Sequence, residues 1–273
     1  MSKKNVGYIG LGNIGKPSAK HLICDQFEAH VFDIYQPAVD ELVELGAIAS
    51  PSPAAMAQSC EHIGICVLDD SQVEDLLYGE QGLLENAAAG TIIAIHSTIT
   101  QAGILKWAAD GEARNIKIID APITGGAGGA EAGTLCYMVG GDESTVATAS
   151  KVFETSADKV VHAGEIGTGI VLKLCNNMIT YAEFMAMHEA VKLAEAGGLS
   201  AEILREVGKS NGVITENMHS FIANRNALGA GCTDEQMDEF FGGFGRLAQK
   251  DLACAIESAG TLGVTLPYTE KLQ

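Results

Sequence analysis

Residues 6–15 read VGYIGLGNIG, and this stretch decides the fold. A short apolar run predicts a strand, and the turn Gly10-Leu11-Gly12-Asn13-Ile14-Gly15 leads into a helix that ends near Cys24. In a dinucleotide-binding turn the first glycine permits the tight bend, the second leaves room for the pyrophosphate, and the third lets helix and strand pack closely. The helix N-terminus offers N–H groups to the phosphates. All six residues of the turn are therefore candidate dinucleotide-binding residues.

Asp33 supplies the context that the glycines need, because a chain with 32 glycines can show this spacing by chance. It ends a second strand-like run, residues 29–33, and lies 33 − 15 = 18 residues past Gly15. A carboxylate at this point can accept both ribose hydroxyls of NAD. No Lys or Arg occurs in residues 34–36 to neutralise the extra phosphate of NADP, so NAD is favoured. An ordinary βαβ turn with a helix-capping Asp is the weaker alternative, since strand, glycines, helix and acid are in register.

The rest of the chain predicts an α/β domain followed by helices. Further apolar runs alternate with helical segments, as in parallel βαβ units, at 63–68, 91–95 and 117–119, with possible additions at 135–139 and 159–161. Residues 170–196 contain no Pro or Gly and place apolar residues at helical spacing, and Gly197-Gly198 ends them. We expect a Rossmann dinucleotide-binding domain over 1–162, a long connecting helix, and a mainly helical domain over 163–273.

Charge and composition exclude several classes of partner. The formal net charge of −18 and the pI of about 4.6 disfavour nucleic acids and anionic membrane surfaces. No apolar run is long enough to span a bilayer, and no signal segment is evident. The seven cysteines are scattered without a C-x-x-C pair, and the histidines show no H-E-x-x-H spacing. We expect a cytoplasmic protein with free thiols and no bound metal.

Four separate segments carry a resemblance to a known family. They are residues 7–15, residues 120–126 (DAPITGG), residues 164–169 (GEIGTG) followed by Lys173 and Asn177, and residues 250–252 (KDL). In this order they resemble the β-hydroxyacid dehydrogenase family, which includes 3-hydroxyisobutyrate dehydrogenases and short-chain semialdehyde reductases. The resemblance implies an NAD-linked oxidoreductase that acts on a small hydroxy acid or its semialdehyde or keto acid.

The resemblance also assigns roles to residues. Lys173 becomes the general acid/base, with Asn177 on the same helix face at i+4. A lone lysine on an amphipathic helix is more often at the surface, and the family match favours catalysis instead. Thr124, Gly125 and Gly126 would bind the substrate carboxylate. The remaining matches are cofactor-binding residues: Leu68, Val73 and Thr98 on the nicotinamide side, Asp69 next to Leu68, and Lys250 in the late closing segment, where it would pair with a pyrophosphate or a substrate carboxylate. From the residues alone, Leu68 and Val73 suit the core and Thr98 suits a helix cap.

Some positions depart from the family pattern. Thr124 stands where Ser is usual, Ile95 and His96 replace an acid-containing approach to Ser97, and the spacing from Phe244 to Lys250 is short. The chain ends at Gln273, where relatives continue through another helix, so an abbreviated helical domain or a trimmed chain is expected. An imine reductase-like enzyme and a dinucleotide sensor without turnover are the alternative functions. The resemblance further implies a homodimer or homotetramer.

Overall fold

A computed structural model of the chain describes residues 3–229 and 231–273. The chain divides into two compact units, Met1–Lys173 and Leu174–Gln273. Helix α9 (Thr168–Ala196) continues through this division. The domain boundary expected between residues 162 and 163 stays a prediction.

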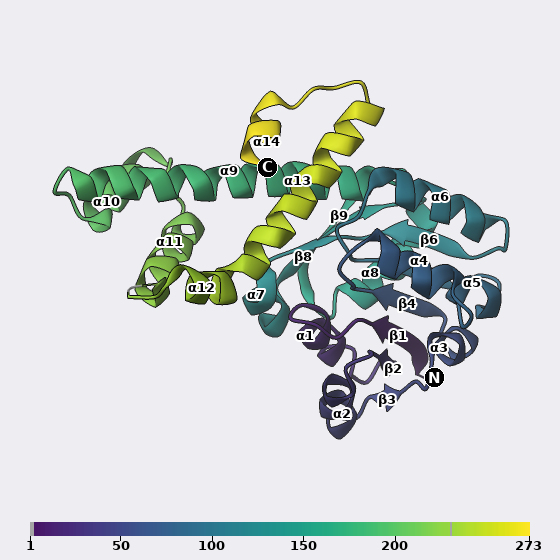
Figure 1. The fold of residues 1–273 in the computed structure, drawn as a ribbon. Coiled ribbons are helices and arrows are strands. Elements are labelled where there is room, and N and C mark those ends of the chain that lie inside the picture. The colour runs from purple at the N-terminus through teal and green to yellow at the C-terminus, as the bar shows by residue number, and fades with distance from the viewer. Residues whose placement is uncertain (1–2, 230) are drawn as a thin grey trace. The chain divides into compact units, whose positions relative to one another are not determined.

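The first unit is a Rossmann-like α/β domain, as predicted (Figure 1). Its sheet has the order β3-β2-β1-β4-β5-β6-β8-β7, and β9 pairs with β8. The first six strands in the chain are parallel: β1 (Lys4–Ile9), β2 (Phe27–Phe32), β3 (Ile48–Ala49), β4 (His62–Ile65), β5 (Ile92–Ile95) and β6 (Lys117–Asp120). The expected additions form β8 (Leu135–Gly140) and β9 (Ala157–Gly164). β8 runs antiparallel to β6 and to β7 (Ile123–Thr124), so the sheet is mixed at this edge.

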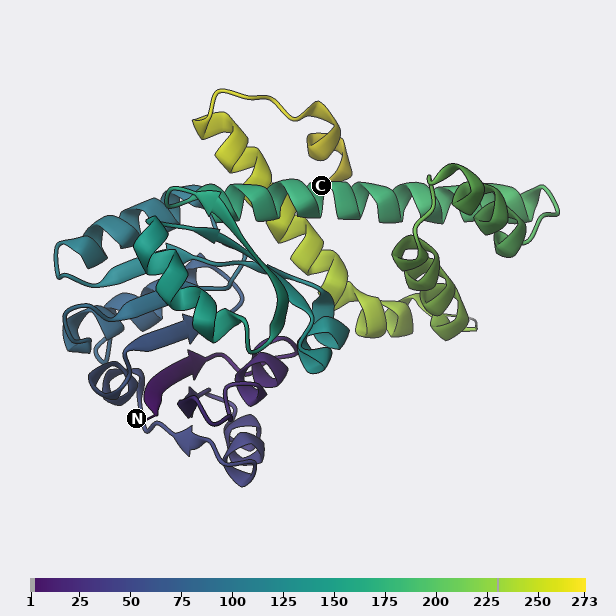
Figure 2. The same cartoon turned by 180° about the vertical axis from the view of Figure 1, so that it is seen from behind.

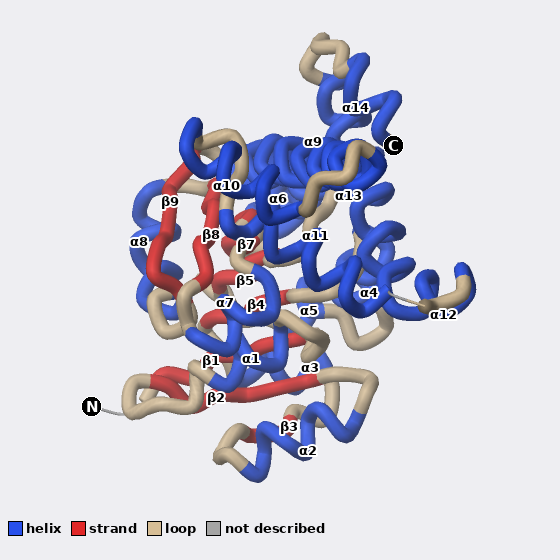
Figure 3. Tube along the Cα trace, turned by 90° about the vertical axis from the view of Figure 1, so that its left-hand side faces the viewer, coloured by secondary structure: helices blue, strands red, loops and turns tan. Residues whose placement is uncertain are grey.

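Helices cover both faces of this sheet, which explains why the central strands β4 and β5 are buried along their whole length. All residues of β4 and β5 are buried, and Figure 3 shows the strands as a layer between helices. Among the described residues, apolar core clusters lie around β1 and β2 and around β5, β6 and β8. The covering helices are α1 (Gly15–Lys20), α2 (Gln36–Glu44), α3 (Pro53–Ser59), α4 (Asp70–Tyr78), α5 (Leu83–Asn86), α6 (Gln101–Glu112), α7 (Gly126–Ala132) and α8 (Glu143–Phe153).

The second unit is helical, and the predicted long helix is confirmed as α9. The other elements are α10 (Ala201–Asn211), α11 (Glu216–Gly229), α12 (Asp234–Met237), a π-helical turn (Asp238–Gly242), α13 (Gly243–Thr261) and α14 (Pro267–Leu272). α13 crosses α9, as Figures 1 and 2 both show. A small core joins Met187 and Val191 of α9 to Ile214, Met218 and Ile222. No helix in the described part of the chain is both long and apolar enough to cross a membrane.

Candidate active site

The β1–α1 turn has the geometry that its glycines predict. Gly10 has φ +91°, and a side chain there would overlap the carbonyl oxygen of Cys66. A side chain at Gly15 would overlap the carbonyl oxygen of Gly10, so this glycine permits the close approach of helix and strand. Around Gly12 there is open space within 4 Å of the position that a Cβ would take. Gly10 and Gly15 are therefore needed for the fold of the turn itself, whereas Gly12 faces open space in which a ligand can lie.

Asp33 follows β2 directly, and backbone N–H groups hold its carboxylate. Oδ2 accepts a hydrogen bond of 2.5 Å from the Leu11 N–H, and Oδ1 accepts one of 2.7 Å from the Tyr35 N–H. The first bond joins the end of β2 to the glycine-rich turn, 22 residues earlier in the chain. The carboxylate is thus fixed beside the turn with spare lone pairs, as an acceptor for ribose hydroxyls needs to be.

The loops after β4 and β5 meet at the same edge of the sheet. Ser97 Oγ accepts a hydrogen bond of 2.9 Å from the Val67 N–H. Asp70 accepts bonds from the N–H of Thr100, at 3.1 Å, and from its hydroxyl, at 2.5 Å. Ligands of open α/β sheets bind at the carboxyl ends of the strands, so these loops lie on the expected side.

The nicotinamide-side candidates occupy different environments in these loops. Leu68 is 66% exposed, which contradicts a core position, whereas Val73 is fully buried. Asp69 is the N-cap of α4, and its side chain accepts from the Gln72 N–H at 3.0 Å. Thr98 is not the cap of α6, because the helix begins later and Thr100 accepts from the Gly103 N–H.

The loop Thr124-Gly125-Gly126 exposes its backbone. Thr124 ends β7 opposite Cys136 of β8, which fixes where the loop begins. Gly125 has φ +130° and Gly126 has φ +65°, values that non-glycine residues rarely adopt. Both glycines are solvent-exposed, and a Cβ on Gly126 would meet no atom within 4 Å. The loop can therefore offer N–H groups and the Thr124 hydroxyl to an anionic ligand.

Lys173 lies near the start of α9 and is nine-tenths buried, with 9% of its surface exposed. The surface position that is usual for a lone helix lysine is therefore wrong here. A glycine bend, Gly167 with φ +87°, precedes the helix. Asp120, at the end of β6, accepts hydrogen bonds from the Gly167 N–H at 2.8 Å and the Ile170 N–H at 2.7 Å.

In the second unit, Asn177 belongs to a buried polar network. Its Nδ2 donates to Oδ2 of Asp251 at 2.7 Å, and the Tyr181 hydroxyl donates to the same oxygen at 2.7 Å. Lys250 forms an ion pair of 2.9 Å with Oδ1 of Asp251, which is only 2% exposed. Burial, together with the Asp251 carboxylate, raises the pKa of the Tyr181 hydroxyl, so Tyr181 stays protonated as a donor.

Sequence reasoning did not single out Asp251 or Tyr181. Tyr181 follows Asn177 by four residues on α9, so its position on the same helix face was a readable signal. Asp251 is separated from Asn177 by 74 residues, and nothing local in the sequence joins them. Its adjacency to Lys250 within the KDL segment was the only hint.

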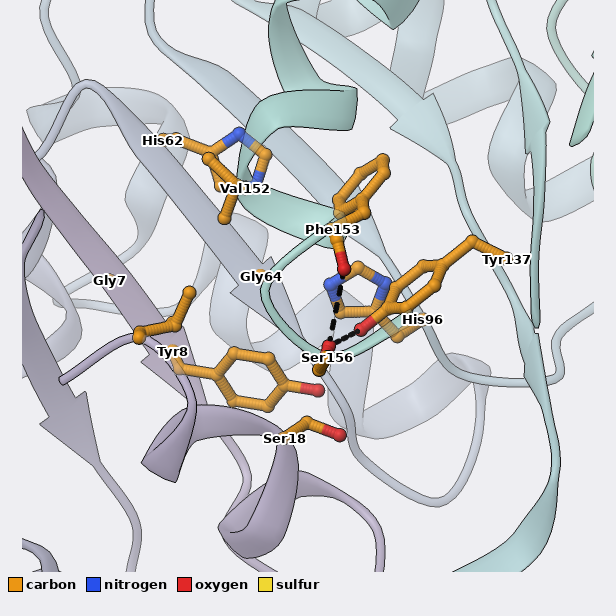
Figure 4. A pocket seen from close by; sticks show the side chains of 11 residues that line it. Gly7, Tyr8, Ser18, His62, Gly64, His96, Tyr137, Val152, Phe153 and Ser156 are labelled. Carbon is orange, nitrogen blue, oxygen red and sulfur yellow. Dashed lines mark hydrogen bonds between the residues drawn. The ribbon is translucent and has the colours of Figure 1, made fainter. Parts of the chain in front are cut away.

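The first unit also contains a small internal cavity, which is lined by residues other than the candidate site residues (Figure 4). Its volume is about 10 Å³, comparable with one water molecule, so it cannot hold a substrate. The ring of His96 stacks on Tyr8 at 5.6 Å, and its Nδ1 lies 2.9 Å from the Ala121 carbonyl oxygen. His62 also lines the cavity. Among the described residues, no group of three or more His, Cys, Asp or Glu side chains could hold a metal ion.

Comparisons with known proteins define the class. Residues 5–164 match the family model described as the NAD binding domain of 6-phosphogluconate dehydrogenase. Residues 167–273 match the model described as NAD-binding of NADP-dependent 3-hydroxyisobutyrate dehydrogenase. Together with the glycine turn and its carboxylate, these matches make the protein a nicotinamide dinucleotide-binding oxidoreductase.

Individual relatives agree with this class. The 3-hydroxyisobutyrate dehydrogenase of Pseudomonas aeruginosa is 33% identical over 266 residues, which cover 96% of this chain and 88% of that protein. The NAD-dependent L-serine dehydrogenase of the same organism is 39% identical over 205 residues, covering 75% and 68%. The structure of Mycobacterium tuberculosis 3-hydroxyisobutyrate dehydrogenase with L-serine has a TM-score of 0.84 at 27% identity, covering 99% and 91%.

The chain belongs to the 3-hydroxyisobutyrate dehydrogenase-like β-hydroxyacid dehydrogenase family. It is an NAD(P)-dependent dehydrogenase that acts on the CH–OH group of hydroxy acids. The sequence-based family assignment is confirmed. The individual site residues, the choice between NAD and NADP, and the cytoplasmic location stay predictions.

Proposed function

We propose that this chain transfers a hydride between NAD(H) and a small hydroxy acid, or its semialdehyde or keto acid, with Lys173 as the general acid/base. The observation that carries the proposal is the burial of Lys173 near the start of α9, directly after a glycine bend. Burial shields the amine from bulk water, which suits a group that exchanges a proton with a bound substrate. The relatives named for 3-hydroxyisobutyrate and L-serine suggest a short acid with a β-hydroxyl as substrate.

The protein's part in the reaction is to move one proton and to orient the substrate. The dinucleotide, when bound, takes the hydride from the substrate carbon, or supplies it in the reverse direction. In oxidation the neutral Lys173 amine accepts the proton of the substrate hydroxyl. In reduction the Lys173 ammonium polarises the carbonyl and donates the proton. Asn177, whose amide is oriented by Asp251, would keep the lysine or the hydroxyl in line.

Substrate and cofactor contacts complete the proposal. The exposed N–H groups of Gly125 and Gly126, with the Thr124 hydroxyl, suit a carboxylate. Gly10 to Gly15 and Asp33 would hold the dinucleotide. The family resemblance alone supports the nicotinamide-side roles of Leu68, Val73 and Thr98 and the cofactor roles of Asp69 and Lys250.

Turnover of a substrate panel tests this function. The panel contains 3-hydroxyisobutyrate, L-serine, other short hydroxy acids and semialdehydes, each assayed with NAD(H) and NADP(H), and a cyclic imine with the reduced cofactors. We expect one cofactor reduced per hydroxy acid oxidised. Reduction of the imine without turnover of any hydroxy acid would instead favour the imine reductase-like alternative. Cofactor binding without turnover of any substrate would favour the dinucleotide sensor.

Replacing Asp33 with Ser should weaken the preference for NAD. The wild-type kcat/KM should favour NAD over NADP by about tenfold or more, because a carboxylate repels the extra phosphate, and hydrogen bonds to a charged group contribute about 1.5–3 kcal/mol. In D33S the ratio should fall by roughly tenfold. Steady-state kinetics with both cofactors measures the ratio. The matched control is D40S, which alters an exposed acid on α2 and should leave the ratio unchanged. Wild-type protein that prefers NADP contradicts the assignment of Asp33.

We expect a homodimer or homotetramer formed through the helical unit. Large apolar side chains are exposed on α9, on α10 and in the loop between them: Ile179, Met185, Leu193, Leu199, Ile203 and Val207. Exposed apolar surface on one part of a protein is typical of a protein–protein interface. Light scattering coupled to gel filtration should give two or four times 28.5 kDa. Charged substitutions at Leu193 and Val207 should shift the mass toward the monomer, whereas a monomeric wild type would rule out this expectation.

A further inference from the structure

Asp120 is a fully buried carboxylate that the proposed reaction does not use directly. It is the last residue of β6, pairs with Ile95 of β5 in parallel register, and lies opposite Gly140 of β8 in antiparallel register. Its backbone is therefore fixed by two neighbouring strands of the sheet. Its side chain bonds outward, to the start of α9, 47 and 50 residues further along the chain.

Both oxygens of the Asp120 carboxylate accept hydrogen bonds from backbone N–H groups at the start of α9. Oδ1 accepts from the Gly167 N–H at 2.8 Å, and Oδ2 accepts from the Ile170 N–H at 2.7 Å. First-turn N–H groups have no acceptor within their own helix, so a carboxylate satisfies them and also interacts favourably with the positive end of the helix. Burial raises the pKa of the Asp120 carboxyl, and these N–H groups oppose that rise.

The backbones of two glycines pack closely against this carboxylate. A Cβ on Gly140 would lie 2.8 Å from Oδ2 of Asp120 and still closer to Oδ1. A Cβ on Gly169 would lie 2.9 Å from Oδ2 and would also overlap the Met138 carbonyl oxygen. Two glycines, one in β8 and one in the first turn of α9, thus provide the space for this contact. At Gly169 the backbone of α9 therefore packs directly against the backbone of β8, with no side chain between them.

We propose that Asp120 is a positioning residue, which fixes the first turn of α9 to the sheet and thereby sets the place of the Lys173 amine relative to the substrate loop. Ile170 precedes Lys173 by three residues, about one helical turn. In the other direction, Asp120 precedes Thr124 by four residues and is part of the same DAPITGG segment. The Asp120 carboxylate therefore connects the start of α9, which carries Lys173, to the segment that carries the substrate loop at Thr124. This inference rests on the proposed role of Lys173.

The test is a double-mutant cycle of Asp120→Asn and Lys173→Ala in the full chain, with the best substrate of the panel. Asn keeps the size of the side chain, but its NH₂ group faces N–H donors and its charge is gone. We expect D120N to lower kcat by roughly 10–100-fold, since small displacements of reacting groups have effects of this order. The dissociation constant for NADH and the KM should change less than about threefold. In the K173A background D120N should have no further effect on kcat, because both changes act on the same proton transfer.

The matched control is Asp142→Asn. Asp142 is the N-cap of α8 in the same unit, where it accepts from the Thr145 N–H at 3.0 Å. Asp142 Oδ2 also accepts from the Thr145 hydroxyl at 2.6 Å, and its negative charge interacts favourably with the N-terminus of the helix. D142N keeps the cap but removes this charge, so it should lower the melting temperature modestly with kcat unchanged, whereas D120N should lower both. A purely structural role for Asp120 predicts the behaviour of D142N, and wild-type kcat in folded D120N overturns the proposal.

Two further results keep the test decisive. If D120N does not fold, amide hydrogen exchange in the wild type still reports on the contact: the Gly167 and Ile170 amides should be protected, unlike the Glu202 amide in the first turn of α10. Exchange of all three at similar rates overturns the proposal. Full activity in K173A would remove the proposed function itself, whereas an inactive K173A with a fully active D120N removes only the inference about Asp120.

Discussion

Replacing Lys173 with Ala should lower kcat by about 10²–10⁴-fold, the usual contribution of a general acid/base, with NADH binding changed less than about threefold. Ala removes the group that accepts the hydroxyl proton but leaves the glycine turn and Asp33 intact. The helix should persist, because Ala has the highest helix propensity. Initial rates and a fluorescence titration of NADH measure the two quantities independently.

Two companion variants separate chemistry from structure. Lys192→Ala removes an exposed lysine from the same helix and should leave kcat unchanged. Lys173→Arg retains the positive charge but cannot lose its proton near neutral pH, so it should be nearly as inactive as K173A. Added methylamine should restore part of the K173A rate, since a small free amine can occupy the vacated space. Near-normal turnover in K173A would refute the assigned role.

Acid should destabilise the first unit from about pH 6.5 downward, because two buried histidines resist protonation. Burial lowers the pKa of His62 to about 3 and that of His96 to about 4. In the unfolded chain both imidazoles bind a proton near pH 6.5, so the stability that they contribute is present above this pH and is lost as the pH falls toward 4. At pH 5 the loss for the pair is about 4 kcal/mol. His30, whose pKa is also lowered by burial, acts in the same direction.

Denaturant unfolding between pH 8 and pH 5 measures this dependence. His62→Phe should reduce the loss of stability over this range by about half, because one of the two titrating rings is gone. Neither ring nitrogen of His62 has a hydrogen-bond partner among the described residues, so the substitution should cost little at pH 8. Phe153→Leu, which alters the ring packed edge-on against His62 but removes no titrating group, is the control and should keep the wild-type slope. An H62F slope equal to that of the wild type would show that His62 is not buried as a neutral ring.

Features that depend on local patterns were predictable from the sequence. Continuous apolar runs predicted the buried parallel strands, and the absence of Gly and Pro over residues 170–196 predicted α9. The helix begins two residues earlier than predicted, at Thr168, because the bend needs only the positive φ of Gly167. The glycine turn and Asp33 were found because their spacing is set within one βαβ unit.

Features that depend on distant contacts were not predictable. The sequence shows Asp120 as the first residue of the DAPITGG segment but does not predict its hydrogen bonds, because its partners lie at the start of α9. The antiparallel entry of β8 was missed since an apolar run carries no sign of strand direction. The position of Thr98 before a helical segment predicts a helix cap, but the turn is two residues longer and Thr100 has that position.

The three glycines of the β1–α1 turn face different kinds of selection. Any side chain at Gly10 or Gly15 meets a carbonyl oxygen of the protein itself, so drift at these sites is limited by the ability to fold. At Gly12 a methyl group would meet nothing within 4 Å, so the fold of the turn does not require glycine there, and the proposed dinucleotide contact would be the constraint. A descendant of this lineage that abandoned its cofactor would therefore be expected to lose Gly12 first, while retaining the other two.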